Sequence, residues 1–258
     1  TSGKNRRDPS GLPHFFPAGQ PLAPELRTGL ALWLDATDAD SLVLHDGRVA
    51  EWQDRSGQPY SLTDPAPKPP DQFSGLVTWL DASASNRLVL SQGLVSQWRD
   101  RSSTGIHASQ EEAARRPKPV SDPASGRMMV RFDGVDDLMG LPRMGTVGTV
   151  IWVGREDATA ALGYGTGVGD SQNARWERGR LGCLYQADDG SGAATWTKTV
   201  RYNAETIDPV LTPVPRQTVV VTTVASSSVG LDTIASSRGT GGSFWQGDLA
   251  EIVVFNRV

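Results

Sequence analysis

Three aspartates near the middle of the chain have the residue type and spacing of an oxygen-rich cation site. Asp133, Asp136 and Asp137 lie in FDGVDD, where Asp-Gly predicts a tight turn. Carboxylate oxygens gathered on one turn suit calcium, which prefers hard oxygen ligands. Aspartates also accept hydrogen bonds from the backbone of their own turn, so a purely structural role is the alternative. Calcium is therefore the one cofactor that the sequence suggests, and we expect no other.

A loop with aromatic and basic side chains is a second candidate site. The segment QNARWERGR contains Arg175, Trp176 and Arg178, and Tyr164 lies shortly before it in the glycine-rich GYGTGVGD. A flat indole ring beside guanidinium groups can stack on a sugar face and bind its hydroxyls. These four residues are predicted to form a surface recognition patch, and the alternative is a loop that its tryptophan merely anchors.

The sequence contains no recognisable set of catalytic residues. Hydrolysis of a glycoside needs two carboxylates that face one substrate, but Glu111 and Glu112 are adjacent and would point apart on a strand. None of the histidines, His14, His45 and His107, lies near a nucleophile motif. We therefore expect a protein that is not an enzyme.

Charge and hydropathy limit the classes of partner that we expect for this protein. The 258 residues include 25 Lys+Arg and 29 Asp+Glu, which gives a formal net charge of −4. Nucleic acid and anionic membranes attract basic surfaces, so neither is expected as the main partner. Insertion into a membrane is not expected either, because no apolar run reaches the roughly 18 residues that a spanning helix needs. Cys183 is the only cysteine, so the chain cannot form a disulfide within itself.

The elements that must position these candidates begin with a repeated stretch. Residues 29–57 and 75–103 align at a constant offset of 46 without a gap, and 15 of the 29 positions are identical. Two tryptophan pairs, Trp33/Trp79 and Trp52/Trp98, are part of the repeat, and an aromatic residue repeated at one strand position indicates a core role. The repeated Asp-Arg-Ser predicts a fixed turn with a charge-assisted hydrogen bond.

Composition divides the rest of the chain into segments. Residues 1–28 are rich in proline and are predicted to form an extended arm, on which Phe15 and Phe16 would dock either on this chain or on a neighbouring subunit. Residues 29–58 are the partial repeat of the opening strands. Residues 59–74 contain five closely spaced prolines and are predicted to be a linker without strands. Residues 75–258 are predicted to form one domain.

Short β-type segments separated by turn residues dominate this domain. The expected strands are 29–35 and 48–54 in the first copy, and 128–133, 147–154, 181–186, 194–202, 216–224 and the C-terminal segment in the domain. No window has a sustained helical period with caps, so helix should be scarce. The pattern predicts an all-β, two-sheet antiparallel sandwich, preceded by an extended arm and a duplicated strand pair.

The order of motifs carries a family resemblance. WLDA, W-x-D-R-S, R-F-D-G-x-D-D, T-V-I-W-V-G and F-x-G-D-L-A-E-I-V-V-F follow one another as in the laminin-G-like branch of the concanavalin A-like jelly rolls, which residues 75–258 resemble almost from end to end. The resemblance implies that the first and last strands lie side by side, which would bring GLVTWLDA next to LAEIVVFN. The family includes hydrolases, lectins and adhesive modules, so the fold alone does not give the function.

The first copy is surplus to such a domain, and its strands need a partner because an isolated strand pair is marginal in water. It could pair with its own domain, add to the sheet edge of a neighbouring molecule, or be a relic of the duplication. Two function classes follow. The first is a structural or adhesive subunit of an extracellular fibre, appendage or virion surface, which assembles with other subunits through Phe15, Phe16, Trp33 and Trp52. The second is a lectin-like module that binds glycan through loops at one end of the sandwich.

Overall fold

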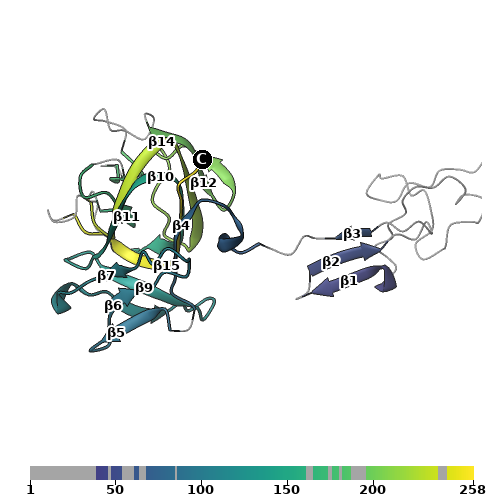
Figure 1. Cartoon of the computed structure of the whole chain (residues 1–258), viewed down its shortest axis with the longest axis horizontal. Coiled ribbons are helices and arrows are strands. Elements are labelled where there is room, and N and C mark those ends of the chain that lie inside the picture. Colours follow the sequence, from purple (N-terminus) through teal and green to yellow (C-terminus); the bar gives the residue numbers. More distant parts are fainter. Residues whose placement is uncertain are drawn as a thin grey trace, which may run out of the picture. The chain divides into compact units, whose positions relative to one another are not determined.

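Antiparallel strands predominate among the described residues of both units of the chain. The computed structural model describes residues 39–45, 48–53, 61–63 and 68–258, with the exception of 85, 161–164, 174–175, 180–181, 187–195 and 238–242. The two compact units are Thr1–Lys68 and Pro69–Val258 (Figure 1). The boundary between the units therefore falls inside the predicted linker.

The second unit is an all-β sandwich of twelve hydrogen-bonded strands, which confirms the predicted fold class. Its strands are β4 (Leu76–Asp81), β5 (Leu88–Ser91), β6 (Leu94–Trp98), β7 (Ala108–Ser109), β8 (Lys118–Ser121), β9 (Met128–Asp133), β10 (Met139–Glu156), β11 (Val168–Gly169), β12 (Thr197–Tyr202), β13 (Glu205–Ile207), β14 (Val219–Ile234) and β15 (Gln246–Phe255). The named helices of this unit are two 3-10 turns, η3 (Pro70–Gln72) and η4 (Ala113–Arg115). Helix is thus scarce in the described residues, as predicted.

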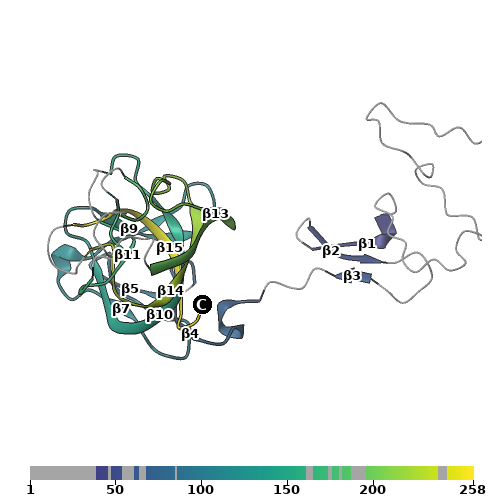
Figure 2. The same cartoon turned by 90° about the horizontal axis from the view of Figure 1, so that it is seen from above.

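Hydrogen bonds connect the strands in the order β13-β12-β14-β10-β15-β9-β8. β4 pairs with β15 as well, β11 pairs with β14, and β7 links the hairpin of β5 and β6 to the beginning of β10. All of these pairs are antiparallel. β9 and β4 pair with successive parts of β15, at Gln246–Leu249 and Glu251–Phe255 respectively. The opening and closing strands of the domain are therefore neighbours, as the resemblance implied (Figure 1; Figure 2).

Two long strands join the layers of the sandwich. The register between β10 and β14 shifts three times, between Gly140 and Met144, between Met144 and Val147, and between Val147 and Thr149. Such irregularities bend a strand and increase its twist. The second half of β10 pairs with β15, whereas its first half pairs with β7. The sheet therefore turns a corner along β10 and β14 and folds over its own interior.

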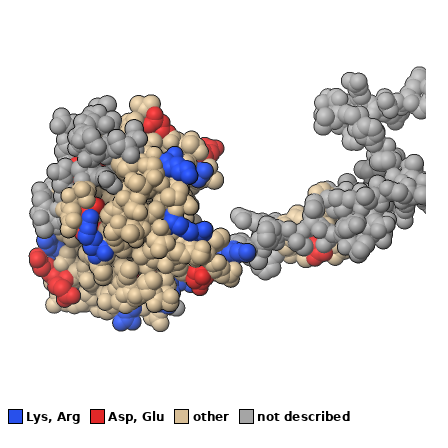
Figure 3. Space-filling view, turned by 45° about the horizontal axis from the view of Figure 1, so that its top comes forward, with Lys and Arg blue, Asp and Glu red and all other residues tan. Residues whose placement is uncertain are grey.

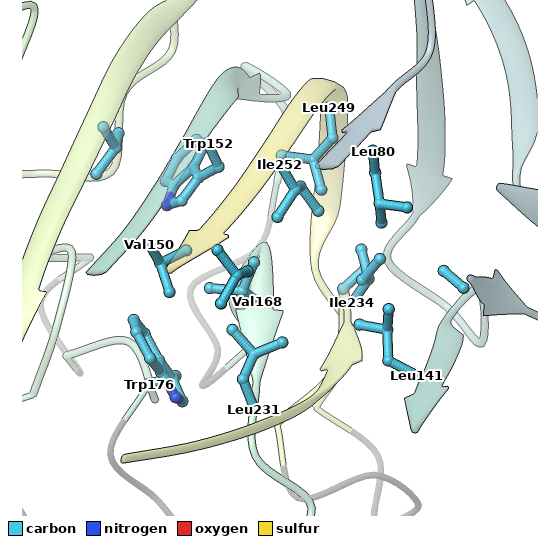
Figure 4. Close-up of a cluster of buried hydrophobic side chains, with 14 of the residues drawn as sticks. Leu80, Leu141, Val150, Trp152, Val168, Trp176, Leu231, Ile234, Leu249 and Ile252 are labelled. Carbon is cyan, nitrogen blue, oxygen red and sulfur yellow. The ribbon is translucent and has the colours of Figure 1, made fainter. Parts of the chain in front are cut away.

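One large apolar cluster fills this interior. Its fully buried members come from most strands and from the intervening loops, and include Leu80, Val95, Trp98, Phe132, Val150, Trp152, Val168, Trp176, Trp196, Leu231, Ile234, Leu249 and Ile252. Figure 4 shows the side chains of β10, β14 and β15 pointing toward one another across the interior. Burial of this cluster is the main stabilising contribution to the sandwich. A smaller cluster on the other side of β4 and β15 contains Trp79, Val253 and Phe255.

The first unit has a sheet of its own. β1 (Leu42–His45), β2 (Arg48–Gln53) and β3 (Ser61–Thr63) form a three-stranded antiparallel sheet, which the 3-10 turn η2 (Ala39–Ser41) precedes. In the described part of this unit, no strand pairs with the twelve-stranded network. β3 supplies a third strand locally, which the sequence did not predict, while addition of the first copy to the sheet edge of a neighbouring molecule stays a prediction.

Two sequence predictions need correction. β3 lies in the segment that was predicted to be a linker without strands, where it fits between Pro59 and Pro65. Residues 182–186, predicted as part of a strand, form turns with one isolated bridge between Cys183 and Pro213. The strand predicted at 29–35 lies outside the described residues.

Candidate functional site

The three predicted calcium ligands gather on the turn between β9 and β10. One carboxylate oxygen from each of Asp133, Asp136 and Asp137 lies within 4.8 Å of the other two. Gly134 makes the turn possible, because its φ of +77° is left-handed and a Cβ there would meet the Cβ of Gln246 at 2.6 Å. The cluster has the hard oxygen chemistry that calcium prefers, and the protein would supply three of the six to eight oxygens that calcium needs.

The same carboxylates also serve the turn. Asp133 Oδ1 accepts the backbone N–H of Val135 at 2.8 Å and that of Asp136 at 3.3 Å. Asp137 Oδ2 accepts the N–H of Asp133 at 3.1 Å. The structural role is thereby confirmed for Asp133 and is shared by Asp137, while calcium binding stays a prediction.

The surroundings of Asp137 disfavour the ionised form of its carboxyl group. Burial of its carboxyl group, followed by the negative charge of Asp133, raises the pKa of Asp137 to about 7. Near neutral pH the group is therefore partly protonated. A bound cation would favour the ionised form and would lower this pKa again.

Both described members of the predicted surface patch are buried. Trp176 is 1% exposed and packs edge-on against Tyr185 and Trp196, with interplanar angles of 75° and 63°. Its indole N–H donates to the carbonyl of Gly230 at 2.7 Å. Arg178 is 3% exposed. These two residues anchor the loop from inside, so the recognition patch is wrong for both.

Tyr164 and Arg175, the other two members of the predicted patch, lie outside the described residues. The anchored-loop alternative is the correct one for Trp176, because a ring that is 1% exposed is not accessible to a ligand.

Arg178 is buried because it has a partner that the sequence does not reveal. Its guanidinium forms a two-pronged ion pair with Glu156 at the end of β10, where Nη2 and Oε2 are 2.9 Å apart. Burial raises the pKa of Glu156 in spite of this pairing. The pair borders a pocket of about 490 Å³, whose other walls include Tyr202, Val214 and Arg216. Two buried opposite charges are tolerated here because both carboxylate oxygens accept hydrogen bonds from the guanidinium, although Arg178 Nε has no partner among the described residues.

The repeated Asp-Arg-Ser builds the predicted fixed turn in the second copy. Asp100 Oδ1 accepts the N–H of Trp79 at 2.8 Å, which ties the turn to β4. Its carboxylate also accepts bonds from Ser102, Thr104, Gly105 and Ile106, at distances of 2.6 to 3.2 Å. The prediction of a charge-assisted turn is thus confirmed for this copy.

The neighbouring Arg101 extends this arrangement over the outer face of β4. Its guanidinium pairs with Asp81 and lies 3.8 Å from the centre of the Trp79 ring. The Trp79 indole donates to Glu251 on β15 at 2.6 Å. Trp79, Asp81, Asp100 and Arg101 all have identical counterparts in the first copy.

The described strands of the first copy reproduce those of the second. The pair Leu42↔Trp52 corresponds to Leu88↔Trp98 at the offset of 46, and the register shift that follows in β1 and β2 recurs at the same place in β5 and β6. The third strand keeps the offset as well, because Trp52 pairs with Leu62 as Trp98 pairs with Ala108. The duplication is therefore longer than the sequence identity indicated.

Sequence comparison could not have found this third strand, since residues 58–63 and 104–109 share no identical position. An edge strand is held by backbone hydrogen bonds, which place few demands on side-chain identity.

The two copies differ in how much of their apolar face is covered. In the second copy Val95 and Trp98 are completely buried. In the first copy Val49, the counterpart of Val95, is 44% exposed, and Trp52 is half-buried. Phe15, Phe16 and Trp33, the other predicted assembly residues, lie outside the described residues. Trp52 is therefore the one predicted assembly residue whose surroundings are known.

Comparisons of the chain with protein-family models, with curated proteins and with solved structures found no match. No helix among the described residues is long and apolar enough to cross a membrane. On the face of the sandwich visible in Figure 3, acidic and basic side chains are interspersed among uncharged ones and neither sign forms a continuous patch. The function must therefore be argued from the molecule itself.

Proposed function

We propose that this protein is a non-catalytic structural or adhesive subunit of an extracellular fibre, appendage or virion surface, and that it assembles with other subunits through its first unit. One observation carries this proposal. The sheet β1-β2-β3 has the same register as β5-β6-β7, yet Val49 is exposed where its counterpart Val95 is buried, and Trp52 is half-buried where Trp98 is fully buried. An apolar face of this kind is typical of a surface that another molecule covers.

The sandwich itself is proposed to be the adhesive or load-bearing body of the subunit, and to belong to the laminin-G-like branch of the concanavalin A-like folds. The pairing of β4 with β15 supports this assignment, because it brings together the two ends of the domain. The position of the Asp133 turn beside Gln246 on β15 agrees with the same motif order.

No observation on the described residues favours the lectin-like alternative, since Trp176 and Arg178 are buried. We therefore do not propose glycan recognition by this loop.

The proposal is tested by measuring the mass of the full chain and of residues 69–258 by light scattering across a range of concentrations. The shorter chain contains the whole sandwich core, so it is expected to fold alone. The full chain should have at least twice the mass of one chain, and the shorter one should be monomeric. The proposal would be overturned if the full chain and residues 69–258 had the same number of chains per particle.

A further inference from the structure

A pocket of about 490 Å³ in the sandwich has no part in the proposed function. It lies between the ends of β10 and β12, the segment that contains Arg178, and residues 212–217, which lead into β14. The pocket reaches the surface, because its lining residues Pro213, Arg216 and Gln217 are exposed. Its volume is in the range of sites that bind small molecules.

Hydrogen bonds fix the walls of this pocket before any ligand arrives. The backbone N–H of Val214 donates to the carbonyl of Gly182 at 2.9 Å. The Tyr202 hydroxyl donates to the carbonyl of Pro213 at 2.8 Å. Residues 212–217 are thus fastened both to the Gly182 turn and to the end of β12. A site that is held in this way loses little conformational freedom when a ligand binds.

Most of the wall is apolar. Val214 is 7% exposed and Pro215 is buried, while Tyr202 and Val219 are half-buried and pack against the main core cluster. An apolar group that enters the pocket would therefore leave water and meet side chains that the core already holds in place. A ring or a branched chain suits these walls.

The charged residues of the lining carry one net positive charge. Glu156 and Arg178 neutralise each other, since both carboxylate oxygens accept hydrogen bonds from the guanidinium. Arg178 Nε is buried and has no partner among the described residues. Arg216 is the third charged residue of the lining, and it belongs to none of the ion pairs formed within the described part of the chain.

The positive charge of Arg216 acts on the interior of the pocket. Burial raises the pKa of Glu156, and the charges of Arg178 and Arg216 oppose this rise. Negative charge is thus stabilised on this side of the pocket, and the same guanidinium would stabilise an anionic group of a ligand. A cationic ligand would be disfavoured, because the one carboxylate of the lining is already paired with Arg178.

We propose that this pocket binds a small organic acid, with its apolar part against Tyr202 and Val214 and its carboxylate on Arg216. A guanidinium and a carboxylate match in shape, because two parallel N–H groups can donate to the two oxygens. The lining belongs entirely to the second unit, so this binding does not depend on the proposed assembly through the first unit.

The inference is tested in the full chain with 4-phenylbutyrate and with its uncharged counterpart, 4-phenylbutanol. Ligands with about a dozen non-hydrogen atoms reach dissociation constants on the order of 1 mM. The acid should bind with a constant of this size and about 10-fold more tightly than the alcohol, because only the acid pairs with Arg216. 4-Phenylbutylamine should bind more weakly than the alcohol. Saturation-transfer NMR titrations measure all three constants.

Two arginines provide matched variants. Arg216→Gln removes the charge from the pocket at an exposed position, where the fold tolerates the change. It should weaken binding of the acid by about 10-fold and leave that of the alcohol within about 3-fold of the parent value. Arg201→Gln removes the same charge from β12, beside Tyr202 but outside the pocket lining, and should leave both constants unchanged.

The methyl groups of three valines show where the acid binds. Val214 and Val219 line the pocket, whereas Val95 is a core residue of β6 outside its lining. Addition of 4-phenylbutyrate should shift the methyl resonances of Val214 and Val219 and leave those of Val95 in place.

Several results would overturn the assignment. They are equal binding of the acid and the alcohol, equal binding of the acid by the parent chain and Arg216→Gln, tighter binding of the amine than of the acid, and no binding at concentrations up to about 10 mM. Binding of the acid without a shift at Val214 and Val219 would overturn it too, because the ligand would then lie elsewhere. Light scattering of the same samples reports assembly separately, so failure of the pocket and failure of the proposed function are distinguishable.

Discussion

Aspartate side chains hold the turns of the sandwich from inside. Asp100 is 3% exposed and accepts hydrogen bonds from the backbone of its own turn and from β4. Burial would raise the pKa of this carboxyl group, but the bonds donated by Ser102, Trp79 and Thr104 outweigh it and lower the pKa. The ionised form is therefore the one that the folded state needs.

Replacement of Asp100 by Asn should destabilise the sandwich. The amide has one acceptor oxygen and no charge, so several donors lose their partner, and we expect a loss of about 3 kcal/mol in the free energy of unfolding. Since the folded pKa is lowered, the stability that Asp100 contributes is present above its unfolded pKa and is lost as the pH falls through the folded value. Urea unfolding should therefore show a larger difference in stability between the parent chain and Asp100→Asn at pH 7 than at pH 3. Asp54→Asn, at the equivalent position of the first copy, is the matched control and should leave the sandwich transition unchanged.

Asp137 should show the opposite dependence on pH. Its folded pKa is raised to about 7, so its contribution to stability is complete below the unfolded pKa of about 3.9 and is lost as the pH rises toward 7. Between pH 4 and pH 7 the thermal midpoint of the parent chain should therefore fall relative to that of Asp137→Asn. Calorimetry of both chains at four pH values checks this. A constant difference between them would contradict the raised pKa.

Calcium provides an independent test of the same turn. If the three carboxylates bind the ion, millimolar calcium should raise the midpoint of the parent chain at pH 8 by several degrees, because a ligand that binds only the folded state stabilises it. The increase should be absent in Asp137→Asn and unaffected in Asp157→Asn, another aspartate of the sandwich. No increase in the parent chain would leave the turn with its structural role alone.

At the scale of the element, strands were predictable where side-chain pattern alone decides the structure. The boundaries of β9 match the predicted 128–133, and β12, β14 and β15 lie where β-branched and aromatic residues predicted them. β10 begins earlier than predicted, because Gly140 and Pro142 argue against a strand and the bulges near them accommodate both. β3 was missed for a similar reason, since prolines on either side suggested a linker.

The candidate sites were less predictable than the strands. Three aspartates on one short turn are local, so their proximity follows from the sequence. The role of Arg178 is not local, because Glu156 lies 22 positions away and no sequence pattern pairs them. Trp176 resembled a surface residue for the same reason, since the aromatic rings that enclose it come from other parts of the chain.

The two copies of the hairpin allow one substitution to be compared in two environments. Trp98→Ala removes a fully buried ring from the sandwich core and should cost about 3–5 kcal/mol of unfolding free energy. Trp52→Ala, at the same place in β2, should leave the sandwich transition unchanged and weaken self-association. Chemical unfolding of residues 69–258 with and without Trp98→Ala, and sedimentation of the full chain with Trp52→Ala, separate the effects. A stability loss in the sandwich from Trp52→Ala would contradict this division.

At the scale of the whole molecule, the chain combines a sandwich that has its own core with an additional copy of the opening hairpin, β1 and β2, in the first unit. The main core cluster contains residues of Pro69–Val258 only, among the described residues. The stability of the sandwich therefore depends on its own interior, whereas the proposed assembly would stabilise the first unit.

This difference has a thermodynamic signature in the intact chain. Calorimetry of the full chain should show two transitions, and the one that belongs to the first unit should move to higher temperature with increasing protein concentration. For a dimer, each tenfold increase in concentration adds about 1.4 kcal/mol of stability per mole of dimer, by mass action. The sandwich transition should stay at one temperature and should coincide with that of residues 69–258, which serve as the control. A first transition that does not respond to concentration would contradict the proposed self-association through the first unit. A sandwich transition that moves with it would mean that the two units unfold together.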